Sequence, residues 1–359
     1  MRTAVRIAGN HAEQGSIKMA HDLNQENGRF SIAYSGSRED VWHRHGQEHM
    51  EGKSDADWMA AANLDFTVGQ APAFALQPAP GCVEPSYREA PGYFNYNQKT
   101  GAIYAHVSDR YKVFQPDDMR AFFAQFIGVD DRWSFDVMGK LGNGSKIWMA
   151  ARFQPDLEIA GERHQARLLA TTTFDTTGAT IVKPVVTRPV CANTIAAGMA
   201  EGHGHVSVRH NTRFDRTRVT KQVTDLTKSV ERFKAMGDAM ALAAMAASEI
   251  SDFFKQVLEI PFEAKPADIS ARSMNAFNDL SRAYSQSVRE GAPRQSAWAA
   301  LQAVTRYVDH DRSTRRGSGI DSEDEARFAS ANFGSGDALK GKALAFLMPR
   351  IKDKVPVLA

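Results

Sequence analysis

Residues 174–221 read FDTTGATIVKPVVTRPVCANTIAAGMAEGHGHVSVRHNTRFDRTRVTK. A polar turn at 175–178 precedes the apolar, β-branched run at 181–186, which is typical of a strand. The small residues that follow predict a helix capped by Asn193 and Thr194, because Asn and Thr are favoured at helix N-caps. A basic segment ends the stretch. A strand, a helix start and the densest positive charge of the chain therefore lie within this one segment.

Upstream of this stretch, paired apolar segments predict β-hairpins: 103–107 with 111–114, 133–140 with 146–153, and 168–174 with 180–186. The dipeptide Asn143-Gly144 separates the second pair and is a strong hairpin signal. We expect helices after Ser54, with Asp57 as its capping-box partner, and from Pro116. The segment 70–92 is rich in Pro, Ala and Gly and is expected to be a loop.

Downstream of residue 211 the pattern changes to that of helices. Apolar or small residues recur at alternating spacings of four and three, at Val219, Val223, Leu226, Val230, Phe233, Gly237 and Met240. This spacing predicts one long helix over 212–258 whose coiled-coil-like seam is buried within the domain or used for self-association, and we favour a homo-oligomer. Further helices are expected at 273–287, 296–310 and 337–348, with a polar loop at 311–326.

Together these patterns predict an α+β fold, in which a hairpin-rich, mostly antiparallel sheet is packed by helices and followed by a helical C-terminal half. We expect a disordered leader at 1–18, a sheet domain at 19–211 and a helical region at 212–359 that packs on the sheet. No apolar run approaches the roughly 20 residues of a membrane helix. The first 18 residues lack the apolar segment of a secretory signal, and two cysteines make no disulfide framework, so we expect a cytoplasmic protein.

The basic segment is the strongest candidate site. The net charge is only +2, so any nucleic-acid site must be a local patch. Clustered cations suit phosphates, because each neutralised phosphate releases a counterion, and Trp148 and Phe214 are candidate platforms for stacking unpaired bases. The candidate nucleic-acid-binding residues are Lys146, Trp148, Lys183, Arg188, Arg209, His210, Arg213, Arg216, Arg218 and Lys221.

A solvated helix face is the competing interpretation of these cations. In that case the arginines pair with Asp215, Asp225 and Glu231. The basic loop at 312–319 has the same two interpretations, as a helix C-terminus or as a second contact for a phosphate chain.

Enzyme chemistry receives less support from the sequence. Cys191 precedes His203, His205 and His210 and is a candidate activated thiol, but its apolar flanks favour a buried cysteine. The alternating histidines lack the further ligand that a metal site needs, and no phosphate-binding glycine loop is present. We therefore expect no metal, no cofactor and no catalytic residue.

Several motifs resemble the phage/plasmid-like proteins that carry the domain of unknown function 932. The resemblance runs from Met19 onward and is centred on TRPVCANT at 187–194, with further motifs at 19–22, 34–36, 41–43, 110–113, 147–150, 209–211, 297–298 and 307–310. The chain departs from the family in having 18 residues before the expected methionine, and at 42–45. The resemblance implies a mobile-element context and association with DNA recombination.

Two functions from different classes follow from these observations. The first is a DNA-metabolism protein that binds single-stranded DNA and promotes strand annealing, since the order of hairpins and helix is loosely similar to that of phage single-strand annealing proteins. The alternative is an interaction protein that acts on a host defence or replication factor without binding nucleic acid.

Overall fold

The computed structural model describes residues 25–26, 29–35, 52–77, 86–187, 192–194, 205–314 and 323–352. Within these residues the central sheet is antiparallel, in the spatial order β12-β11-β10-β8-β7-β3, with β13 also on β11 and β9 also on β10. Its strands are β3 (Ile32–Tyr34), β7 (Trp133–Leu141), β8 (Lys146–Phe153), β9 (Leu157–Ile159), β10 (Glu162–Thr173), β11 (Thr180–Thr187), β12 (Ala192–Thr194) and β13 (Val206–Val208). A separate pair is formed by β1 (Gln25–Glu26) and β2 (Arg29–Phe30).

The helices are α1 (Asp55–Ala61), α2 (Pro116–Ile127), α3 (Arg216–Leu242), α4 (Ala247–Val257), α5 (Ala271–Arg289), α6 (Ala297–Arg306), α7 (Glu323–Phe333) and α8 (Ser335–Leu347). A π-helical turn at Tyr307–Asp311 extends α6, and 3-10 turns lie at Pro266–Asp268 and Met348–Arg350. The expected α+β class is confirmed. Among the described residues, no helix is both long and apolar enough to cross a membrane.

Two of the three predicted hairpins are confirmed. β7 pairs with β8 across the turn at Asn143-Gly144, where Gly144 has a φ of +90° and the Asn143 side chain accepts a hydrogen bond from the Ser145 amide at 3.1 Å. β10 pairs with β11 across a turn in which Asp175 accepts from the Thr177 amide at 3.1 Å. The first prediction is wrong, because β6 (Ile103–Val107) pairs with β5 (Ser86–Asn97) and residues 111–114 form no strand.

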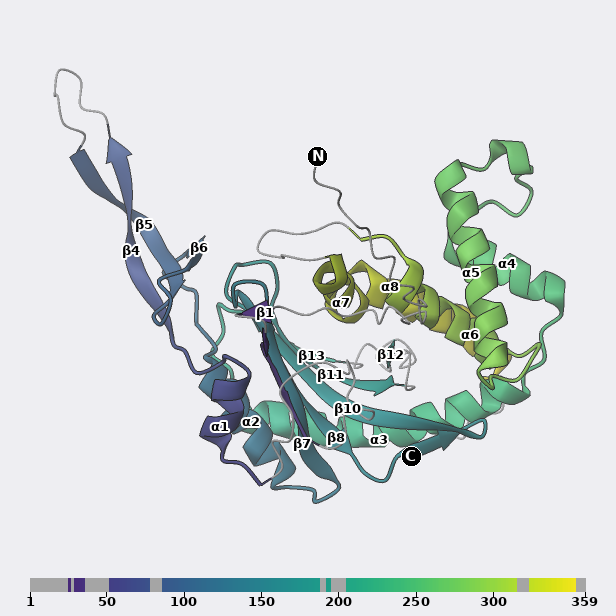
Figure 1. Cartoon of the computed structure of the whole chain (residues 1–359), viewed down its shortest axis with the longest axis horizontal. Coiled ribbons are helices and arrows are strands. Elements are labelled where there is room, and N and C mark those ends of the chain that lie inside the picture. Colours follow the sequence, from purple (N-terminus) through teal and green to yellow (C-terminus); the bar gives the residue numbers. More distant parts are fainter. Residues whose placement is uncertain are drawn as a thin grey trace, which may run out of the picture.

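The predicted loop at 70–92 is instead most of an antiparallel ribbon. β4 (Val68–Gln77) pairs with β5 along its length, and the ribbon extends away from the rest of the molecule as an arm (Figure 1). Pro72 is tolerated because β4 is an edge strand. Gly92 lies next to the register shift at the base, with a φ of +92°, and a Cβ there would lie 2.4 Å from the Val107 carbonyl oxygen. The residues that suggested a loop therefore mark an edge and a bulge.

The predicted helix start at Asn193 and Thr194 is also wrong. Ala192–Thr194 forms β12, in which Asn193 is paired with Val186 and Thr194 with Val185 of β11. β11 offers a free edge on the side away from β10, and a short extended segment satisfies its backbone groups there. The expected capping role of these two residues is replaced by strand pairing. Residues 188–191 and 195–204 lie outside the described residues.

The predicted starts of two helices, α1 and α2, are confirmed. Both helices pack on the face of the sheet that forms the main core. Ser54 and Asp57 form the expected capping box of α1, and α2 begins at Pro116 and buries Met119, Phe122, Phe123 and Phe126. α3 crosses the sheet closely at Gly237, where a Cβ would lie 2.4 Å from Ile159 and 3.2 Å from Trp298. The seam residues Val219, Val230, Phe233 and Met240 are buried within the protein.

The long helix predicted over 212–258 is two helices. α3 ends at Leu242, and α4 begins at Ala247. Between them Met245 donates its amide to the Gln295 carbonyl at 2.8 Å, and Ala297 donates to the Ala243 carbonyl at 2.9 Å. Hydrogen bonds to this distant segment replace those that a continuous helix would make between residues 243 and 246. The apolar periodicity of the sequence does not indicate such long-range contacts.

The second face of the sheet is covered by α7, on the side opposite α2 and α3 (Figure 1). Ile32, Val137, Trp148 and Leu169 pack there against Phe328 in a smaller core cluster. The predicted loop at 311–326 extends into α7, and residues 315–322 lie outside the described residues, as do 1–18. The main core draws on residues from both sides of position 211, such as Phe174 and Phe233.

Candidate nucleic-acid interface

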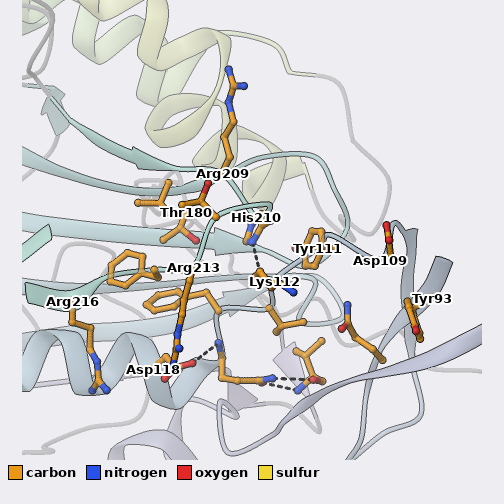
Figure 2. A pocket seen from close by; sticks show the side chains of 18 residues that line it. Tyr93, Asp109, Tyr111, Lys112, Asp118, Thr180, Arg209, His210, Arg213 and Arg216 are labelled. Carbon is orange, nitrogen blue, oxygen red and sulfur yellow. Dashed lines mark hydrogen bonds between the residues drawn. The ribbon is translucent and has the colours of Figure 1, made fainter. Parts of the chain in front are cut away.

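A cleft of about 780 Å³ opens where the base of the arm meets the start of α3 (Figure 2). Its walls are the inner ends of β4 and β5, the segment 109–115, the first turn of α2, and the segment 208–216 that links β13 to α3. Segments far apart in the sequence therefore form one hollow. The basic segment singled out in the sequence lines one side of it.

Two aromatic stacks hold the segments of the cleft together. The rings of Tyr111 and His210 lie 4.6 Å apart at an interplanar angle of 14°, and those of Phe114 and Phe214 lie 4.1 Å apart. The amide of Lys112 donates to the His210 carbonyl, and the Tyr111 hydroxyl donates to the Thr173 carbonyl at 2.7 Å. These contacts fix the direction in which the basic segment leaves β13.

His210 is a positioning residue in this cleft rather than a cation for phosphate. It is buried, and its Nδ1 lies 3.2 Å from the Lys112 carbonyl oxygen, so Nδ1 carries the proton and donates. Burial lowers the pKa of His210, and it outweighs the opposing effects of that hydrogen bond and of Asp175. Burial likewise raises the pKa of Tyr111. Both rings are therefore uncharged at neutral pH.

Acidification is expected to destabilise the protein through His210. Its folded pKa lies below its unfolded value of about 6.5, so the unfolded state binds the proton more readily. The stability that the neutral ring provides is fully present above about pH 6.5 and is lost as the pH falls toward the folded pKa. We expect His210→Phe, which keeps the stack with Tyr111, to lose less in Tm than the wild type between about pH 7 and about pH 5. Equal losses in both proteins would assign the pH dependence to other groups.

Exposed cations line the cleft and continue beyond it. Lys112, Arg209, Arg213 and Arg216 lie at the cleft, against the two carboxylates Asp109 and Asp118. A shallower hollow next to it is lined by Arg213, Arg216 and Arg218, and Lys221 is exposed further along α3. In Figure 2, Arg213 and Arg216 extend toward the same side, whereas Arg209 extends in the opposite direction. Arg213, Arg216 and Arg218 therefore form the denser group.

The competing interpretation pairs these arginines with acidic neighbours, and the described residues do not show such pairs. Within the described part of the chain, none of Arg209, Arg213, Arg216, Arg218 and Lys221 has a carboxylate within 4.0 Å. The Asp215 side chain instead caps α3 by accepting from the Arg218 amide at 3.0 Å, and Glu231 lies 3.9 Å from Arg132. The Asp225 side chain lies outside the described residues.

Two further candidate residues are corrected by their burial. Trp148 is 0% exposed and packs against Phe328 on the second face of the sheet, so it offers no ring to a base. The Lys183 ammonium is also on that face, 2.7 Å from an Asp337 carboxylate oxygen, and burial lowers the pKa of Lys183 against the opposing effect of Asp337. Binding to nucleic acid requires both side chains to be exposed, but α7 packs on Trp148, and α7 and α8 both contact Lys183.

The remaining candidates fall into two groups. Lys146 begins β8 and is half-buried. Arg188, Cys191 and His203 lie outside the described residues, as does the loop at 315–322. Over the residues that the structure describes, no three His, Cys, Asp or Glu side chains are arranged to hold a metal ion.

Sequence reasoning missed Lys112 and Tyr93, which line the cleft. Tyr93 is 38% exposed and lies on β5 at the base of the arm. It was placed next to a segment expected to be a loop, so no pattern connected it with the basic segment. The period-two pairing of 93–96 with 103–107 is the signal that could have placed it.

The model of a family described as a domain of unknown function (DUF932) matches residues 104–331. The match covers more than half of the chain, and the chain belongs to this family. The matched range includes the basic wall of the cleft, whereas β4 and β5 of the arm precede it. Comparisons with curated proteins and with solved structures gave no significant match.

Proposed function

We propose that this protein binds single-stranded DNA along the cleft and the first turns of α3. The observation that carries the proposal is the group of exposed cations without carboxylate partners among the described residues, above all Arg213, Arg216 and Arg218. Unpaired guanidinium groups are free to bind phosphates, and each such contact releases counterions. The positive end of the 27-residue helix α3 adds to the potential at Arg216.

The shape of the cleft favours a single strand over a duplex. Its volume is that of a site for a small ligand, which admits a few nucleotides but not a double helix. Tyr93 is exposed at the cleft, and Phe214 is half-buried beside Arg213, so aromatic rings stand next to the cations. This combination of cations and rings is the one that single-strand binders use.

The proposed role is in the DNA metabolism of a phage or plasmid within the host cytoplasm, where strand annealing needs positioned backbones and exposed bases but no cofactor. Assembly into a homo-oligomer is part of this proposal. The described residues of the α3 seam are buried within one chain, so self-association would use another surface. The competing function, interaction with a host protein without nucleic-acid binding, does not require the cleft.

Titration of labelled oligonucleotides by fluorescence anisotropy tests the proposal. With about four phosphate contacts on a single strand, we expect affinity to fall about 50-fold between about 50 and about 200 mM salt. A single strand should bind more tightly than a duplex of the same sequence, because only the single strand presents free bases to the rings. Absence of binding at the lower salt concentration would overturn the proposal in favour of the protein-partner function.

A further inference from the structure

One face of the arm carries a cluster of large, exposed apolar side chains, and we call it the apolar face. Leu76 and Tyr87 are cross-strand partners, and Phe74 lies two residues from Leu76, so the three side chains share a face. Phe74 and Leu76 are each 56% exposed, and Tyr87 is 74% exposed. Glu89 is the cross-strand partner of Phe74 on the same face, and the opposite face carries the pair Ala75 and Arg88.

Within the described residues, nothing covers this outer half of the arm. β6 pairs only with residues 93–96 of β5, so positions 73–77 and 86–90 form a two-stranded ribbon without a third strand (Figure 1). An isolated two-stranded ribbon is marginally stable in water. A cluster of large apolar side chains on such a ribbon is typical of a binding surface.

We infer that the apolar face of the arm binds the unpaired bases of a single strand as it leaves the cleft. The inference rests on the proposed function and extends it from phosphates to bases. Tyr93 lines the cleft and lies on β5, the strand that carries Tyr87 further out, so the cleft and the arm face are joined by one strand. In proteins that bind single strands, cations hold the backbone and a row of aromatic rings stacks successive bases. The cleft and the arm together provide this arrangement.

The exposed area favours bases over a second copy of the chain. Large side chains of about 150–250 Å² each, exposed by half to three quarters, offer roughly 300–400 Å², about half of what one partner buries in a standard protein interface. The described outer arm has one cation and one carboxylate, Arg88 and Glu89. The arm therefore adds stacking without adding phosphate contacts, and its contribution depends little on salt.

Oligonucleotides of two lengths distinguish binding by the arm from binding by the cleft. An oligonucleotide of about 6 nucleotides fills the cleft, whereas one of about 20 nucleotides reaches along the arm as well. For the double variant Phe74→Ser/Tyr87→Ser we expect unchanged affinity for the short strand and a loss of about tenfold or more for the long strand. The slope of affinity against salt should stay the same. The matched control is Phe262→Ser, an aromatic residue that is 55% exposed. It follows α4, and α4 lies at the end of the molecule opposite the arm (Figure 1).

Each outcome decides the inference. Loss of long-strand affinity in the arm variant alone supports it. Equal long-strand affinity in the wild type and the arm variant overturns the role of the arm and leaves the cleft proposal standing. If the wild type binds neither strand, the proposed function fails and the arm inference fails with it. A change in oligomeric state of the arm variant by light scattering, with unchanged strand binding, would assign the face to a second copy of the chain.

Discussion

Reversing two charges at the start of α3 is expected to abolish single-strand binding without unfolding the protein. In Arg213→Glu/Arg216→Glu two cations of the cleft become anions, so two phosphate contacts are replaced by repulsion. We expect a loss of about 100-fold or more at about 50 mM salt, and a smaller salt slope for any residual binding. Anisotropy titration with the labelled single strand measures both quantities.

The stability of this variant should match that of the wild type. Both arginines are exposed and lack a carboxylate partner within the described residues, and a carboxylate in the first turn of α3 suits the helix dipole. The control Arg272→Glu/Arg294→Glu makes the same change in net charge at two exposed arginines near α5, and it should retain binding. If both variants lose affinity equally, net charge rather than the cleft governs binding.

The elements predicted correctly are those that neighbouring residues determine. The Asn143-Gly144 turn, the Ser54 capping box and the helix start at Pro116 each follow from the preferences of a few adjacent residues. The exposed cations Arg213 and Arg216 were also found, because a basic run is visible in the sequence itself. The sequence did not indicate whether these cations have partners, since an ion pair depends on where distant carboxylates lie.

The errors came from contacts between distant segments. β12 became a strand because β11 had a free edge, and the break after α3 arises from hydrogen bonds to residues 295–297. Lys183 and Trp148 were expected at the surface because alternation along a strand does not tell whether one face or both are covered. α7 covers the second face, and its first residues were expected to be part of a loop. At these positions tertiary packing determined the secondary structure and the burial, and it overrode the preferences of neighbouring residues.

Removing the carboxylate of Asp136 is expected to cause the largest loss of stability of any substitution considered. Arg167 of β10 is 0% exposed, and its guanidinium donates to Asp136 at 2.5 Å, to Thr187 at 2.5 Å and to Gln165 at 2.7 Å. The side chain thereby crosses β8 to reach β7 and also binds β11. In Asp136→Ala the buried cation loses its carboxylate, which costs about 3–5 kcal/mol. Urea denaturation followed by circular dichroism measures the change.

A double variant distinguishes the role of the two charges from the contribution of the two side chains to packing. In Asp136→Leu/Arg167→Met both charges are replaced by apolar side chains, so no buried charge is left unpaired, and we expect stability within about 1 kcal/mol of the wild type or above it. Such a recovery would show that the pair is needed for charge compensation rather than for packing. If the double variant is as unstable as Asp136→Ala, the hydrogen bonds of Arg167 to Thr187 and Gln165 hold the strands together, and the guanidinium is required as a donor. A loss below about 1 kcal/mol in Asp136→Ala would mean that other groups compensate the buried guanidinium.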